Sequence, residues 1–232
     1  FTTLALSNID DKERVKDYLA KTLASSNHLL SLINDVLDMN KLESGKETIE
    51  SASFDLTHLM DDVASLVNAQ ITEMGITHCT HRGELTHTRL IGSLLRLRQI
   101  MLNLFSNAIK YTPRGGSVEV NVNELPCERE GFARIQTVVT DTGIGMSKEY
   151  LPTIYDSFSR ERNTTMGKVA GTGLGMAIVK ELVTMMGGTI EVKSELGEGT
   201  TFTVTLDHKI AETRHDDRKE IASRKAAAES LA

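Results

Sequence analysis

The 232-residue sequence contains no tryptophan and has only six phenylalanines, four tyrosines, three prolines and two cysteines. With so few aromatic rings, we expect a core built mainly from Leu, Ile, Val and Met. Cys79 and Cys127 lie far apart and outside any CxxC pair, so we expect free thiols in a reducing compartment rather than a disulfide framework. No apolar run approaches the roughly 18 to 20 residues that a membrane-spanning helix needs.

Positive charge is also limited. The 32 acidic residues exceed the 26 basic residues and give a net charge of −6, so the basic surface that nucleic-acid binding requires is not expected. The first residues show neither a signal peptide nor an initiator methionine, which suggests a piece of a longer protein whose other parts could be membrane-anchored. For this chain we expect a cytoplasmic location, no membrane contact and no nucleic-acid partner.

Residues 1–45 are expected to form part of a helical hairpin. Apolar residues from Val15 to Val36 alternate in steps of four and three, which predicts one helix over residues 11–43. A second apolar stripe makes this face too wide for a two-stranded coil and suits a bundle of three or four helices. Residues 1–7 resemble the end of a preceding helix. Because one hairpin cannot close such a bundle, we expect a homodimer through this region.

Residues 46–207 predict a second domain in which strands and helices mix. Strands are expected at 48–54, 77–82, 86–91, 117–125, 132–141, 189–194 and 200–207, and helices at 55–74, 94–111, 148–155 and 173–186. This order lacks strict strand–helix alternation and favours an α/β sandwich, with one mixed sheet and helices on one face. Residues 208–232 are charged and rich in alanine, which predicts a solvated helix or linker. A linker to a further domain is the alternative.

Two glycine motifs indicate ligand-binding turns. Asp141 ends a predicted strand and precedes Thr-Gly-Ile-Gly, a pattern that lets a flat ligand approach the backbone closely but also occurs in simple turns. Gly171-Thr-Gly-Leu-Gly-Met176 precedes a helix, whose first N–H groups can bind an anion. Its spacing and surroundings fit neither a dinucleotide-binding nor a Walker A motif. A glycine hinge without a ligand is the alternative.

A third motif lies on the helix predicted over residues 94–111. Asn103, Asn107 and Lys110 are four and three residues apart, so they share one helix face. Carboxamide oxygens are hard ligands that suit Mg²⁺, and a lysine suits phosphate. The alternative is that the amides cap neighbouring loops.

Together, the order of these three motifs resembles the ATP-binding catalytic domain of sensor histidine kinases, within the gyrase-like and Hsp90-like ATPase superfamily. The resemblance covers residues 46–207 and implies a Bergerat-type ATP site with ATP and Mg²⁺ as cofactors. Residues 1–45 resemble the end of the first helix and all of the second helix of the family's dimerisation and phosphotransfer hairpin. The family transfers the γ-phosphate of ATP to a histidine and then to an aspartate of a response regulator or receiver domain.

The resemblance also implies roles for single residues. Asn103 and Asn107 stand where the family coordinates Mg²⁺ and the phosphate chain, and Asp141 stands where it accepts the adenine amino group. Phe158 resembles the aromatic residue of the family's lid motif, which would span residues 159–170. The full set implied to bind ATP is Asn103, Asn107, Lys110, Tyr111, Asp141, Gly143, Gly145, Phe158, Arg160, Gly171, Gly173, Leu174, Gly175 and Thr200.

The sequence departs from the family in two places. The segment that carries the phosphate-accepting histidine is absent, and His28 lacks its neighbours and is expected to be a surface residue. The other histidines considered show no metal-ligand spacing and are expected at the surface: His58, His78, His81 and His87. Ser93 replaces the aspartate expected before the 94–111 helix, and we expect it to cap that helix.

Three functions follow from these residues. The first is a histidine kinase catalytic part that cannot phosphorylate itself and could phosphorylate a histidine supplied in trans. The second is a gyrase-like or Hsp90-like ATPase, which is disfavoured because Asn103 stands where those relatives have a glutamate base. The third is a nucleotide-binding dimerisation module without catalysis.

Overall fold

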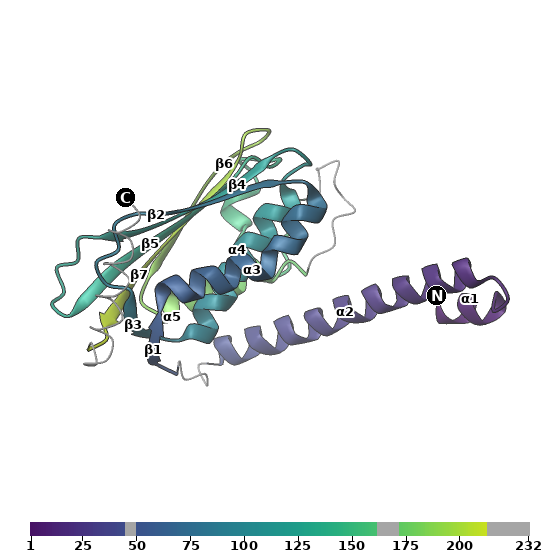
Figure 1. The fold of residues 1–232 in the computed structure, drawn as a ribbon, viewed down its shortest axis with the longest axis horizontal. Coiled ribbons are helices and arrows are strands. Elements are labelled where there is room, and N and C mark those ends of the chain that lie inside the picture. Colours follow the sequence, from purple (N-terminus) through teal and green to yellow (C-terminus); the bar gives the residue numbers. More distant parts are fainter. Residues whose placement is uncertain (45–49, 162–171, 213–232) are drawn as a thin grey trace, which may run out of the picture. The chain divides into compact units, whose positions relative to one another are not determined.

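The computed structural model describes residues 1–44, 50–161 and 172–212 (Figure 1). The chain divides into two compact units, one formed by Phe1–Glu47 with Ile154–Ile178 and the other by Thr48–Thr153 with Val179–Ala232. Within the described residues, no helix combines the length and the apolarity needed to cross a bilayer.

The first unit contains the expected helical hairpin. Helix α1 (Thr2–Ser7) is followed by a turn and the long helix α2 (Lys12–Glu43). The Asp11 carboxylate begins α2 by accepting a hydrogen bond from the Arg14 N–H at 3.2 Å, and the Phe1 ring stacks on Tyr18. The apolar side chains of α2 remain exposed within one chain, with Leu23 at 64% and Ile33 at 48%. This helix therefore presents a face suited to packing against further helices.

The second unit is built on one mixed sheet of seven strands. The strands are β1 (Ala52–Asp55), β2 (Thr77–Arg82), β3 (Arg89–Gly92), β4 (Ser117–Leu125), β5 (Phe132–Asp141), β6 (Thr189–Glu195) and β7 (Gly199–Ile210). Their order is β1-β3-β7-β5-β4-β2, and β6 pairs with β7. The β2–β4 pair is parallel, and the other pairs are antiparallel.

Helices cover one face of this sheet. Helices α3 (Leu56–Met74) and α4 (Leu94–Tyr111) lie side by side on that face (Figure 1). The core between helices and sheet is aliphatic, as expected, with Val120 of β4 and Leu104 of α4 fully buried. Each such side chain contributes roughly 1.5–3 kcal/mol through burial. The predicted α/β sandwich is therefore confirmed.

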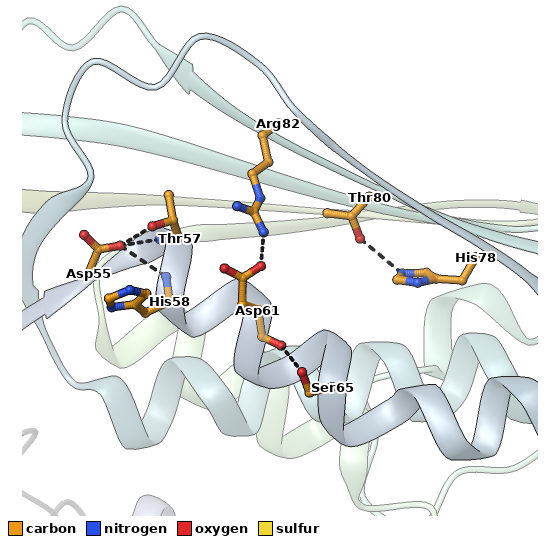
Figure 2. Close-up of polar contacts among 8 residues, drawn as sticks. All are labelled: Asp55, Thr57, His58, Asp61, Ser65, His78, Thr80 and Arg82. Atoms are coloured by element: carbon orange, nitrogen blue, oxygen red, sulfur yellow. Dashed lines mark hydrogen bonds and ion pairs between the residues drawn. The ribbon is translucent and has the colours of Figure 1, made fainter. Parts of the chain in front are cut away.

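Polar contacts fix α3 at its start and along its length (Figure 2). The Asp55 carboxylate accepts hydrogen bonds from the N–H groups of Thr57 at 2.8 Å and His58 at 3.1 Å, which satisfies donors that a helix start leaves unpaired. Further along, Asp61 pairs with Arg82 of the edge strand β2. These contacts hold both the helix start and the sheet edge in place.

Two boundaries differ from the sequence-based expectation. Strand β3 begins at Arg89 rather than at residue 86, because the His87 N–H donates a hydrogen bond to the Glu124 carboxylate at 2.8 Å instead of joining the sheet. In place of the helix expected over 148–155, the structure has a single 3₁₀ turn, η1 (Leu151–Thr153).

Other boundaries shift because of long-range pairing. Strand β7 continues to Ile210, beyond the expected end at residue 207, because β3 pairs with its last two residues. Helix α5 (Gly175–Met185) is two residues shorter at its start than expected. Strand β1 begins at Ala52, four residues later than expected. Residues 45–49 lie outside the described residues, and so do residues 213–232, which make up most of the expected tail.

Candidate functional site

Helix α4 carries a polar face that points away from the core. Asn103, Asn107 and Lys110 are partly exposed, whereas Phe105 and Ala108 between them are buried. The carboxamides of Asn103 and Asn107 form no hydrogen bond to other side chains or backbone groups in the described part of the chain. The helix therefore presents two carboxamides and one ammonium group on a single face.

The end of β5 carries the most perturbed acidic group of this unit. Asp141 is only 6% exposed, and its carboxylate accepts a hydrogen bond from the Gly143 N–H at 2.8 Å. Burial raises the pKa of Asp141 to about 6, although the N–H groups of Gly143 and Thr200 favour the ionised form. A buried carboxylate with this pKa is ionised at neutral pH. No cationic side chain contributes to the shift of its pKa, so the carboxylate is suited to accept a hydrogen bond from a ligand.

Glycine is required directly after this carboxylate. A Cβ atom on Gly143 would lie 2.5 Å from Asp141 Oδ1 and 2.7 Å from the Tyr111 carbonyl oxygen. Both distances are shorter than real Cβ contacts allow, so any side chain at this position would displace the carboxylate or the end of α4. The geometry shows why glycine is needed here within the chain itself, and the expected approach of a flat ligand to this backbone stays a prediction.

The loop after β5 is bonded to the end of α4. The Ile144 N–H donates to the Tyr111 carbonyl oxygen at 3.2 Å, and the Thr142 N–H donates to the Ser117 carbonyl oxygen at 3.0 Å. Tyr111 also lies beneath Lys110, whose Nζ is 4.8 Å from the ring centroid. The Asp141 loop and the C-terminal end of the polar α4 face are therefore neighbours.

The β6–β7 turn supports the same loop from the other side. Gly145 has a φ of +64°, and a Cβ atom there would lie 1.9 Å from the Glu195 carbonyl oxygen. The Gly197 N–H donates to the Ile144 carbonyl oxygen at 2.8 Å. Gly145 therefore allows the Asp141 loop to lie directly against the turn.

Thr200, which the resemblance implied to bind ATP, lies beside Asp141. The two residues are paired across β7 and β5, and Thr200 is 8% exposed. Its hydroxyl contacts Ser194 of β6, with the two oxygens 2.9 Å apart. Sequence reasoning did not select Ser194. The signal was available in the hairpin itself, because residues 194 and 200 are equally distant from Gly197 at its tip.

The remaining predicted residues belong to the first unit. The Phe158 N–H donates to the Gly173 carbonyl oxygen at 3.0 Å, so the aromatic motif and the second glycine motif adjoin. Phe158 has a φ of 64° and is 63% exposed. Leu174 is buried, Arg160 is exposed and Gly175 begins α5. Gly171 and residues 162–170 of the expected lid lie outside the described residues.

Two of the four histidines lie at the surface as expected, because His58 and His81 are exposed. His78 and His87 are half-buried instead, the first against the Phe105 ring and the second against the Glu124 carboxylate. The side chain of His28 lies outside the described residues. Among the described residues, no group of three or more His, Cys, Asp or Glu side chains is arranged to hold a metal ion. Ser93 precedes α4, as expected, but its side chain makes no capping hydrogen bond, so the expected side-chain cap is absent.

Comparison with known proteins identifies the family. Residues 92–210 match the family described as histidine kinase-, DNA gyrase B- and HSP90-like ATPase. The chain is 38% identical over 208 residues to the non-motile and phage-resistance protein of Caulobacter vibrioides, covering 89% of this chain and 24% of that protein. It is 37% identical over 207 residues to sensor protein GacS of Pseudomonas syringae pv. syringae, covering 88% and 22%. The chain thus spans about a quarter of the length of these relatives.

Solved structures agree with this result. Full-length ShkA in complex with AMPPNP matches with a TM-score of 0.71 and 31% identity, over 85% of this chain and 40% of that chain. Histidine kinase ThkA in complex with response regulator protein TrrA matches with a TM-score of 0.65 and 22% identity, over 88% and 54%, a likeness of fold alone. The chain therefore belongs to the family of histidine kinase-, DNA gyrase B- and HSP90-like ATPases, as the order of its three motifs predicted.

Proposed function

We propose that this chain is the catalytic part of a two-component sensor histidine kinase, which binds ATP with Mg²⁺ and transfers the γ-phosphate to a histidine on another segment. One observation supports this proposal above all. The buried Asp141 carboxylate stands at the end of β5. In the loop that follows, the Ile144 N–H donates to the carbonyl oxygen of Tyr111, the last residue of the helix that carries Asn103 and Asn107. The proposed acceptor for the adenine and the proposed phosphate and Mg²⁺ ligands therefore lie on neighbouring segments.

The residues of α4 would hold the charged part of the nucleotide. The amide oxygens of Asn103 and Asn107 suit Mg²⁺, which commonly uses few protein ligands together with phosphate oxygens. Lys110 would neutralise phosphate charge. When bound, the Mg²⁺ ion would supply further charge neutralisation at the phosphates. Phosphoryl transfer depends mainly on positioning and charge stabilisation. These side chains would provide both without a general base that removes a proton.

The residues that would contact the adenine and the lid residues complete the proposed ATP-binding set. Asp141 and Thr200 would contact the adenine, and Gly143 and Gly145 would let it lie against the backbone. The remaining members are proposed to act on the phosphates or the lid: Tyr111, Phe158, Arg160, Gly171, Gly173, Leu174 and Gly175.

Partners and organisation are proposed in the same way. Residues 46–207 would form the nucleotide-binding domain together with residues 208–210, which complete β7. A linker would follow β7. Residues 1–45 would form a homodimer through the exposed apolar stripe of α2, which includes Leu23 and Ile33. A response regulator or receiver domain would accept the phosphate, and the site of action would be the cytoplasm.

A phosphotransfer experiment tests this function. The chain is incubated with γ-labelled ATP, Mg²⁺ and a separately produced hairpin that carries a phosphate-accepting histidine. Acid-labile label on the hairpin is expected. Asn107→Asp should reduce the label, because a negative side chain beside the phosphates would disturb the Mg²⁺–phosphate arrangement. Release of free phosphate without labelled hairpin would instead indicate an ATPase. Nucleotide binding with neither product would indicate a non-catalytic module.

A further inference from the structure

Three neighbouring strands place a polar row beside the proposed base site. Ser194 of β6 is paired with Thr200 of β7, and Thr200 is paired with Asp141 of β5. Residues directly opposite in antiparallel strands lie on the same sheet face. The side chains therefore follow one another in the order Ser194, Thr200, Asp141, and the last two are almost fully buried.

The two hydroxyl groups in this row can form both of their short contacts as hydrogen bonds with only one arrangement of protons. Ser194 Oγ lies 2.8 Å from the Gly199 carbonyl oxygen and 2.9 Å from Thr200 Oγ1. A carbonyl oxygen can only accept, and each hydroxyl has a single proton to donate. Ser194 must therefore donate to Gly199, and Thr200 must donate its own proton to Ser194. Both bonds can form at once only in this way.

The acceptor that fixes this arrangement is itself held rigidly. Gly199 has a φ of +114°, and a Cβ atom there would lie 2.0 Å from the Asp141 carbonyl oxygen. Only glycine fits this close approach, so the main chain of the turn is held against β5. The Gly199 carbonyl group therefore keeps a fixed position relative to both Ser194 and Asp141.

We propose that Ser194 is a specificity-determining positioning residue, which makes the base site select a purine with a 6-amino group over one with a 6-oxo group. This inference rests on the proposed nucleotide binding. With its proton given to Ser194, the Thr200 hydroxyl offers only lone pairs to a further partner, as does the ionised carboxylate of Asp141. A 6-amino group donates to such acceptors. A 6-oxo group brings a third acceptor, and the proton on the adjacent N1 can pair with only one of the two acceptors of the site. At least one buried polar atom then stays unpaired, which binding sites reject strongly.

The matched ligands for a test are ATP and inosine triphosphate, which share their sugar and phosphates and differ at the 6-position and the adjacent ring nitrogen. Dissociation constants are measured by displacement of a fluorescent ATP analogue from the whole chain. The wild type is expected to prefer ATP. Ser194→Ala frees the Thr200 proton to donate to a 6-oxo group, so the preference should fall about tenfold, chiefly through tighter binding of inosine triphosphate.

Two further variants separate positioning from folding. Ser194→Thr keeps a hydroxyl at this position and should keep the wild-type preference. Lys193→Ala changes the exposed neighbour on the same strand and should also leave the preference unchanged. Thermal unfolding of each variant shows whether it is folded. If Ser194→Ala does not fold, Ser194→Cys takes its place, because a thiol is a weak donor and a weak acceptor. The preference of this variant for ATP over inosine triphosphate should then fall.

The outcomes are distinct. A folded Ser194→Ala or Ser194→Cys variant with the wild-type preference overturns the role of Ser194 and leaves the proposed function intact. Failure of the wild type to bind either nucleotide overturns both proposals. A reduced preference in Ser194→Ala that is restored in Ser194→Thr supports the inference.

Discussion

The buried carboxylate of Asp141 links the stability of this protein to its proposed ligand. Burial raises its pKa from an ordinary 3.8 to about 6. The difference corresponds to about 3 kcal/mol by which folding penalises the ionised form. Because the folded state holds the proton more tightly, this group lowers the free energy of unfolding as pH rises from about 4 to 6, and the full penalty applies above pH 6.

Asp141→Asn should therefore stabilise the protein at neutral pH. Asparagine keeps the size of the side chain and an oxygen to accept the Gly143 N–H, but it carries no charge. We expect the variant to raise the free energy of unfolding by up to about 3 kcal/mol at pH 8 and by little at pH 4. Urea unfolding of wild type and variant at several pH values measures this difference. Asp10→Asn, at an exposed position, is the control and should change little.

The same substitution should damage ligand binding. The ionised carboxylate is the proposed acceptor for the adenine amino group, so wild-type affinity for ATP should fall about tenfold between pH 7 and pH 5 as the carboxyl group takes up a proton. Asp141→Asn should bind ATP weakly at both pH values. Calorimetric titration checks both results. A variant that is less stable than wild type at pH 8, or that keeps the wild-type pH dependence of unfolding, would refute this account of Asp141.

Three other substitutions test separate parts of the second unit. Gly143→Ala should lower the free energy of unfolding by about 2 kcal/mol and weaken ATP binding, because its Cβ would collide with Asp141 Oδ1; denaturant unfolding and calorimetry would show it, and unchanged values would contradict the packing described. Ser93→Ala should lower the free energy of unfolding by no more than about 0.5 kcal/mol, measured by urea unfolding, because the Ser93 side chain is buried and makes no capping bond; a larger loss would contradict this. Burial lowers the pKa of His208, so stability should fall as pH drops below about 6.5; His208→Leu should remove that component, and an identical acid limb in both proteins would argue against it.

Much of the second unit follows from local sequence. Strands β4 and β5 have the predicted bounds because runs rich in β-branched residues meet clear breaks, such as the Gly115–Gly116 turn before β4. Helix α4 likewise begins and ends as predicted. These elements carry the Asn103 face and Asp141, so the residues of the proposed site could be selected from the sequence.

The errors arise where distant groups compete for the backbone. The periodicity around residue 87 suggested a longer β3, but the Glu124 carboxylate takes both the N–H and, at 2.6 Å, the ring nitrogen of His87. Nothing in the local sequence indicates that a glutamate 37 residues away is the partner. The end of β7 shifted for a similar reason, since β3 extends it by pairing with Ile210.

Ser194 shows most clearly what sequence spacing leaves out. A serine six residues before Thr200 has no evident link to a carboxylate on another strand. The link appears only when the hairpin register places Ser194 against Thr200, and the β5–β7 register places Thr200 against Asp141. Because the Gly199 carbonyl oxygen can only accept, Ser194 donates to it and Thr200 donates to Ser194. A motif selects the residues that would touch a ligand. The strand pairing next to those residues determines which of them can still donate a hydrogen bond, and therefore which purine base the site can bind.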